Sequence, residues 1–174
     1  ATEHLIGLGH RRIAVTVGRD NIVTGEHRLE GYRQALAAHG LSVERDLLLD
    51  GRFDQSVAHD SVLARMQEHD PPTAIFALSN MMTLGTLNAL HELRLSVPHD
   101  VSVISIDDFD FANIMNPPPT VVAAPVMEMA QAAISALLDE IDRKHVPSGL
   151  QTVFEPRLIV RKSCASRLTA ATSL

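Results

Sequence analysis

The chain has 174 residues, of which 45% are hydrophobic and 21% are charged, and this is the size of one globular domain. Its 21 acidic and 15 basic residues give a formal net charge of −6, which is not the balance of a domain that carries nucleic acid on its own surface. No apolar run reaches about 18 residues, and the N-terminus lacks the pattern of a signal peptide. Together with a single cysteine, Cys164, these features predict no membrane span and favour a reducing cytoplasm.

The first part of the chain alternates between strand-like and helix-like apolar patterns. Strands are predicted over residues 12–18, 47–49, 73–78 and 101–106. Helices are predicted over residues 24–39, 54–68 and 80–93, with Thr24, Asp54 and Asn80 as their N-caps. Because the strands are apolar throughout, this order predicts an α/β fold with a parallel, doubly wound sheet and helices on both faces.

The pattern changes after the fourth predicted strand. Prolines at 117–119 open an extended stretch to Pro125, and a long amphipathic helix is predicted over residues 126–144. Residues 151–162 are predicted to form one or two strands interrupted at Pro156. The small, polar residues 164–174 are predicted to be a disordered tail.

Polar side chains follow each of the four predicted strands. In a parallel sheet the carboxyl ends of the strands lie at one edge, where ligands collect. The candidate ligand-binding residues are Thr24, Arg28, Phe53, Ser79, Asn80 and Asp107. Charged groups, neutral hydrogen-bonding groups and one aromatic ring suit a small polyhydroxylated molecule, although the same residues could be helix caps and loop ion pairs.

A second interpretation of this edge is a phosphatase or receiver domain that uses Asp107, Asp108 and Asp110, since clustered carboxylates bind hard cations. Such sites normally add a lysine, and the only lysines, Lys144 and Lys162, lie far along the chain. The histidines show no metal-ligand spacing, and no nucleophile motif or phosphate-binding loop occurs. The sequence therefore predicts no metal, no cofactor and no catalysis.

The predicted helix 80–93 is apolar on two faces. One face can meet the sheet, whereas Met81, Leu84 and Leu87 fall on roughly the opposite side. Some buried helices share this pattern, but here it favours a subunit interface in a homodimer.

Several segments in order carry a resemblance that covers most of the chain. They are 4–14 (HLIGLGHRRIA), 28–36 (RLEGYRQAL), 72–77 (PTAIFA), 82–85 (MTLG), 97–108 (VPHDVSVISIDD), 117–120 (PPPT), 125–129 (PVMEM) and 156–163 (PRLIVRKS). Together they resemble lactose-repressor-like (LacI/GalR) transcription regulators in the C-terminal effector-binding region, which has a type I periplasmic-binding-protein-like fold.

The resemblance implies two lobes that clamp a sugar, purine or related effector, and a separate helix-turn-helix headpiece that binds operator DNA. It assigns residues 1–121 to the second lobe, 122–150 to a crossover and helix of a largely absent first lobe, and 151–163 to a returning strand. The apolar stripe of the helix is then expected to be covered either by a second copy of the chain or by folding back onto its own lobe, and the stiff proline-rich linker favours the second copy.

The family's effector contacts match this sequence only in part. Thr24, Arg28, Phe53 and Asp107 stand at matching positions, whereas Ser79-Asn80 replaces the usual Asn-Asp pair. Ala124 stands where sugar-binding relatives often have glutamine, so the effector is left open.

The resemblance predicts the effector-sensing and dimerising core of a transcription regulator. An extracytoplasmic sugar-binding protein of the same fold is the nearest alternative, and the phosphatase or receiver domain is a second.

Overall fold

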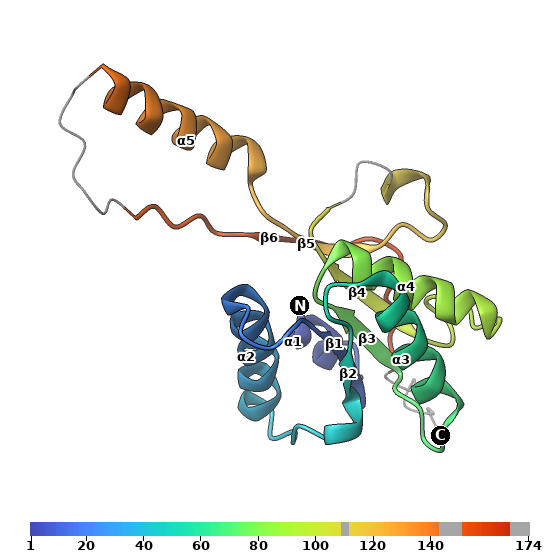
Figure 1. Ribbon diagram of the computed structural model, residues 1–174. Coiled ribbons are helices and arrows are strands. Elements are labelled where there is room, and N and C mark those ends of the chain that lie inside the picture. Colours follow the sequence, from blue (N-terminus) through green and yellow to red (C-terminus); the bar gives the residue numbers. More distant parts are fainter. Residues whose placement is uncertain (109–111, 143–150, 168–174) are drawn as a thin grey trace, which may run out of the picture.

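The computed structural model describes residues 1–108, 112–142 and 151–167 and places one six-stranded sheet at the centre of the chain (Figure 1). The strand order is β2-β1-β3-β4-β5-β6. The strands are β1 (Ile13–Val17), β2 (Leu48–Asp50), β3 (Ala74–Ala77), β4 (Ser102–Ile106), β5 (Thr120–Ala123) and β6 (Arg157–Ile159). The first five pair in parallel and β6 pairs with β5 in the antiparallel sense, which confirms the predicted α/β class.

Helices cover the two faces of the parallel part of the sheet. They are α1 (Thr2–Gly7), α2 (Val23–Ala38), α3 (Gln55–Gln67) and α4 (Asn80–Glu92), with short 3-10 helices at η1 (Arg45–Leu47) and η2 (Ala112–Ile114). Side chains alternate along each strand, so Ile13 and Val15 pack towards α1 and α2 while Ala14 packs towards α3 and α4. Both faces are apolar because both are covered.

Two of the three predicted helix caps are wrong by one or two residues. Asp54 caps α3 as predicted, because its Oδ1 accepts hydrogen bonds from the backbone N–H groups of Ser56 and Val57. In contrast, α2 begins at Val23, so Thr24 lies inside the helix and caps nothing. Ser79, not Asn80, caps α4 by accepting a hydrogen bond from the backbone N–H of Met82.

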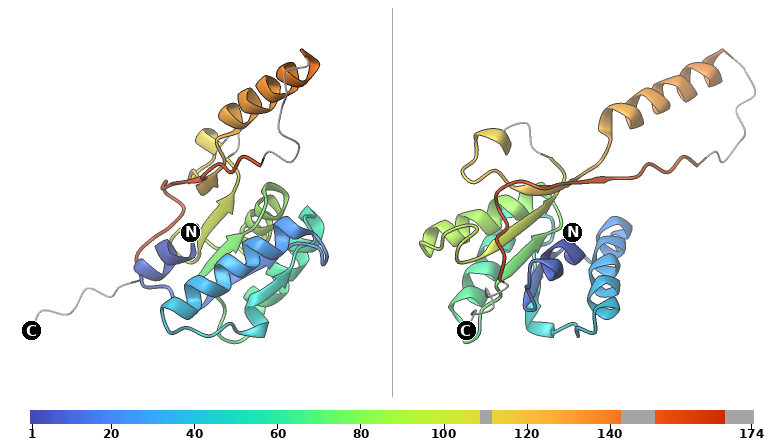
Figure 2. Two further views of the ribbon diagram at one scale, coloured as in Figure 1. Left: turned by 90° about the vertical axis from the view of Figure 1, so that its left-hand side faces the viewer. Right: turned by 180° about the vertical axis from the view of Figure 1, so that it is seen from behind.

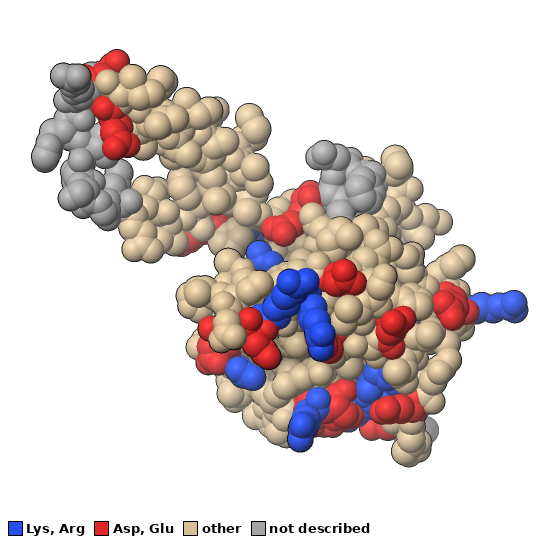
Figure 3. Space-filling view, in the orientation of Figure 1, with Lys and Arg blue, Asp and Glu red and all other residues tan. Residues whose placement is uncertain are grey.

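The last helix, α5 (Val126–Ile141), projects away from the sheet (Figures 1 and 2). We call residues 124–142 and 151–156 the arm and the rest of the described chain the body; β5 and β6 join the two. None of the α5 residues is buried, and Ile134 and Ile141 are 58% and 65% exposed. On the face seen in Figure 3 the arm is mostly uncharged, with acidic side chains near its far end. The predicted end of this helix, at 142–144, falls mainly outside the described residues.

The segment after β6 crosses back over the amino-terminal edge of the sheet, so residues 164–167 of the predicted disordered tail make defined contacts. Ala165 donates its backbone N–H to Ser102 Oγ at 3.0 Å, and Arg167 donates its own to the Leu8 carbonyl at 2.7 Å. Ser163 Oγ accepts a hydrogen bond from the Thr120 N–H at 2.7 Å. Residues 168–174 lie outside the described residues.

Candidate functional site

One cavity of about 450 Å³ lies between the body and the arm, and we call it the crossover cavity. Its walls come from α2, from the ends of β4 and β5, and from both connections to the arm. The residues that line it are Arg28, Ile106, Asp107, Val122, Ala124, Pro125, Met129, Thr152, Val153, Phe154 and Pro156. Among these, Arg28 and Asp107 are the charged residues, so the two predicted ligand contacts of opposite charge line the same cavity. The volume is in the range of small-molecule sites.

Arg28 reaches the sheet from the second turn of α2. Its Nη1 donates a hydrogen bond to the Leu78 carbonyl, just after β3, at 2.6 Å, and this contact holds the half-buried side chain in place. The guanidinium has five N–H donors, so this bond leaves capacity for a ligand.

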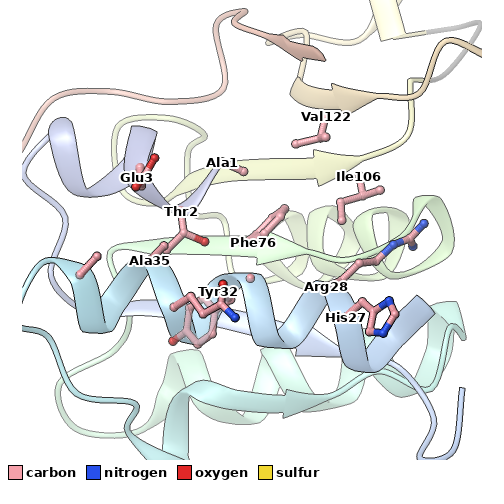
Figure 4. A pocket seen from close by; sticks show the side chains of 13 residues that line it. Ala1, Thr2, Glu3, His27, Arg28, Tyr32, Ala35, Phe76, Ile106 and Val122 are labelled. Atoms are coloured by element: carbon pink, nitrogen blue, oxygen red, sulfur yellow. The ribbon is translucent and has the colours of Figure 1, made fainter. Parts of the chain in front are cut away.

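Arg28 also borders a second cavity of about 470 Å³, between α2 and the sheet (Figure 4). Arg28, Ile106 and Val122 line both cavities. The sheet side of this second cavity is formed by Phe76, Ile106 and Val122, which are apolar.

Asp107 directly follows β4 and has a left-handed backbone, with φ of +70°. Its backbone N–H donates to the Val122 carbonyl at 2.9 Å, which extends the pairing of β4 with β5 by one residue. Aspartate tolerates this conformation better than most residues. The turn brings the end of β4 to the cavity wall.

The next residue, Asp108, binds Arg161 through a two-pronged ion pair. Arg161 Nη1 and Nη2 donate to Asp108 Oδ1 and Oδ2, each at 2.8 Å. This carboxylate raises the pKa of Arg161. In the phosphatase or receiver hypothesis Asp108 would instead hold a cation, and Asp110 lies outside the described residues.

The remaining predicted site residues do not join Arg28 and Asp107 at the cavity wall. Thr24 is exposed in the first turn of α2, and Ser79 is occupied as the cap of α4. Asn80 has a buried Oδ1 that accepts no hydrogen bond from the described part of the chain. A buried acceptor of this kind needs a donor from elsewhere.

Phe53, one of the predicted ligand-binding residues, does not line the crossover cavity. A Cβ built on Gly18 would lie 2.4 Å from its ring, and one built on Gly25 would lie 3.2 Å from it. The ring therefore packs on the backbone of Gly18, between β1 and α2, where a larger residue would collide with it, and it lies close to Gly25 in the first turn of α2.

Sequence reasoning missed the residues that the arm contributes, above all Met129 and Phe154. Met129 is in the first turn of α5, and Phe154 precedes β6. These residues could have been predicted from the order of the elements. The connection from β5 to α5 and the connection back to β6 both lie next to the carboxyl end of β5, so residues of both connections are expected at the cavity.

The outer side of α4 is less exposed than the sequence predicts. Met81 is 46% exposed, but Leu84 and Leu87 are less exposed, because each is half-buried. Leu87 also packs against the core that α4 forms with α3. The three residues therefore form a smaller apolar patch than an isolated helix would present.

Neither a metal site nor a membrane-spanning helix is found among the described residues. They contain no group of three or more His, Cys, Asp or Glu side chains arranged to hold a metal ion. No helix in these ranges has the length and apolar content needed to cross a membrane.

The class of protein follows from the fold and from comparison with known families. Residues 2–164 match the family described as periplasmic binding protein-like domain. A parallel α/β body, two connections at one sheet edge and a cavity beside them are consistent with this class.

The relatives narrow the class to a family of regulators. The chain is 33% identical over 172 residues to the HTH-type transcriptional repressor PurR of Haemophilus influenzae, covering 97% of this chain and 51% of the relative. It is 33% identical over 163 residues to the repressor CytR of Escherichia coli, covering 94% of this chain and 48% of the relative. The structure of the transcriptional regulator CelR in complex with cellobiose matches with a TM-score of 0.84 and 34% identity, over 94% of this chain and 50% of that one.

The chain therefore belongs to the LacI family of transcription regulators, and it spans about half the length of the curated relatives it matches.

Proposed function

We propose that this chain is the effector-sensing and dimerising core of a LacI-type regulator, in which a small polar molecule controls DNA binding by a headpiece outside this chain. The main support is that Arg28 and Asp107, which belong to different elements of the body, line one cavity that is also lined by residues of the arm. A ligand there would contact body and arm together, so it would favour one arrangement of the two. Relatives that are transcriptional repressors favour a regulator over an extracytoplasmic sugar-binding protein or a phosphatase.

The proposed effector is sugar-like, since Arg28, Asp107 and Thr152 offer charged and hydroxyl partners for hydroxyl groups. The regulator CelR binds cellobiose, which makes that disaccharide a reasonable first probe. Asn80 Oδ1 would accept a further hydrogen bond from a ligand that reaches the end of β3.

Isothermal titration calorimetry with a panel of cellobiose, a pentose, a nucleoside and a free nucleobase tests this function. We expect at least one compound to bind, and Arg28→Gln or Asp107→Asn to weaken its binding by about tenfold to a hundredfold, the cost of one charge-assisted hydrogen bond. Arg33→Gln is the matched control, because Arg33 is on the same helix but is exposed and does not line the cavity.

Two results would contradict the proposal. One is that no compound of the panel binds. The other is that Arg28→Gln and Asp107→Asn bind as tightly as the unchanged chain.

A further inference from the structure

The root of the arm is a narrow junction that carries both of its connections. β5 leads into the arm and β6 leads out of it, and the two pair through Val121 with Ile159, Val122 with Leu158 and Ala123 with Arg157. The prolines before β5 have no backbone N–H to donate, but their carbonyls accept hydrogen bonds from the segment that follows β6. The backbone N–H of Lys162 binds the Pro118 carbonyl at 3.1 Å.

Arg161 sits at this junction and is held by several contacts. Its backbone N–H donates to Thr120 Oγ1 at 2.9 Å, and its Nη1 also donates to the Pro119 carbonyl at 3.1 Å. The side chain is only 16% exposed. Its position is therefore set by contacts with Thr120, at the start of β5, and with Pro119, which precedes it.

The same guanidinium grips Asp108 with two parallel hydrogen bonds of 2.8 Å. Such a fork fixes the orientation of the carboxylate as well as its distance, which a lysine ammonium would not do. Asp108 follows Asp107 directly, so the left-handed turn at Asp107 is held on one side by the Val122 carbonyl and on the other by Arg161.

We propose that Arg161 is a positioning residue for the effector site, which holds Asp107 at the wall of the crossover cavity by gripping its neighbour Asp108 from the root of the arm. It lines neither the crossover cavity nor the second cavity, and it acts through Asp108. The pair also ties the end of β4 to both connections of the arm. A movement of the arm would therefore shift the position of Asp107, and a ligand bound to Asp107 would limit the movement of the arm. The role of Asp107 as a ligand contact rests on the function proposed above.

Amide hydrogen exchange measured by NMR on the whole chain tests the positioning without a ligand. Arg161→Lys keeps the charge but removes the fork, and Asp108→Asn keeps the shape but removes the charge. We expect the Asp107 amide to exchange about tenfold faster or more in either variant, because the turn opens locally. The amide of Ile104, in the middle of β4, should keep its rate, which separates local opening from a general loss of stability.

Arg157→Lys is the matched control, since Arg157 also belongs to the β5–β6 junction but is exposed and lines neither cavity. It should leave the Asp107 amide unchanged. The double variant Asp108→Asn with Arg161→Lys should exchange no faster than the single variants, because all three lack the same interaction. Unchanged exchange at Asp107 in both single variants, or additive effects in the double variant, would overturn the inference.

A second measurement links the positioning to binding. For the panel compound that binds the unchanged chain most tightly, we expect Arg161→Lys to weaken binding by about tenfold and Arg157→Lys to leave it unchanged. Equal affinity in Arg161→Lys, with faster Asp107 exchange, would show a structural role only and would overturn the inference. If no compound of the panel binds, the proposed function fails, while the exchange rates still decide whether Arg161 positions Asp107.

Discussion

His10 joins three segments that are far apart in the sequence. Its ring is 1% exposed and lies at the amino-terminal edge of the sheet, opposite the crossover cavity. Because the Ala165 carbonyl at 3.1 Å can only accept, Nε2 carries the proton, and Nδ1 accepts from Thr73 Oγ1 at 2.8 Å. The neutral ring thus fastens the end of the chain to the sheet. Burial lowers the pKa of His10.

This burial predicts a pH dependence of stability. The unfolded chain takes up a proton below the ordinary histidine pKa of about 6.5, whereas the folded chain resists it, so the free energy of unfolding falls as the pH drops below that value. In His10→Gln the lost hydrogen bonds should lower the free energy of unfolding by about 1–3 kcal/mol near neutral pH. The difference in unfolding free energy between this variant and the unchanged chain should become smaller as the pH falls. Urea unfolding at several pH values between about 8 and 5 measures both effects.

His59 provides the control with the opposite sign. Its Nδ1 lies 2.9 Å from Asp60 Oδ1 and its Nε2 lies 3.0 Å from Glu92 Oε2. The hydrogen bond to Asp60, with that to Glu92, raises the pKa of His59. The protonated His59 ring contributes its full stabilisation below the ordinary histidine pKa, and this stabilisation is lost as the pH rises through the raised pKa of the folded chain. The loss of stability caused by His59→Gln should therefore become smaller towards alkaline pH. If the difference in unfolding free energy between His10→Gln and the unchanged chain stays constant over this pH range, the assignment of His10 as a neutral, buried ring is contradicted.

Among the elements, α3 and α4 make the tightest contact in the body. A Cβ built on Gly85 of α4 would lie 2.2 Å from the backbone oxygen of Gln55 and 2.9 Å from the backbone nitrogen of His59. The two helices therefore touch through their backbones, and only glycine fits at the crossing. The half-buried state of Leu84 and Leu87 is consistent with this approach, because neighbouring positions of α4 are drawn towards α3.

Gly85→Ala should separate the two helices at this crossing. We expect a loss of about 1–3 kcal/mol in the free energy of unfolding, because backbone atoms of α3 cannot move aside as a side chain can. Gly31→Ala in α2 is the matched control, since nothing lies within 4 Å of its added Cβ. Alanine there should stabilise the chain by about 0.5–1 kcal/mol through helix propensity. Chemical denaturation measures the stability of both variants. If Gly85→Ala is as stable as the unchanged chain, α3 and α4 can accommodate a methyl group at this crossing and the argument is wrong.

At the scale of the whole molecule, the arm has an apolar side that the body does not cover. Leu137 and Leu138 are each 56% exposed, and they extend the stripe formed by Ile134 and Ile141. Each large side chain gains roughly 1.5–3 kcal/mol when it is fully buried, so association that covers this face is favourable. Assignment of this helix to a first lobe, and of the body to a second lobe, remains a prediction from the family resemblance.

Self-association should therefore involve two surfaces, the α4 patch at Met81, Leu84 and Leu87 and the exposed side of the arm. We expect sedimentation velocity to show concentration-dependent association of the unchanged chain. Leu84→Asp and Leu137→Asp should each reduce it, and the double variant should be monomeric, since a charge at either surface resists burial. A monomer at every concentration for the unchanged chain would rule out both surfaces. Association that neither variant reduces would place the contact elsewhere.

The sequence by itself determined the alternation of strands and helices, the parallel sheet and the cap at Asp54, because these depend on local preferences and apolar periodicity that neighbouring residues carry. The family followed separately, from the resemblance of sequence motifs along the chain. The sequence also brought Arg28 and Asp107 together in principle, because parallel strands end at one edge.

Only the tertiary structure decided which candidate residues line the cavity. Phe53 packs against Gly18 and does not line the cavity. Ser79, and not Asn80, is the N-cap of α4. Met129 and Phe154, which belong to the arm, line the cavity. Each of these outcomes depends on contacts between segments far apart in the chain. The fork from Arg161 to Asp108 spans 53 positions, and no local pattern of the sequence encodes such a pair.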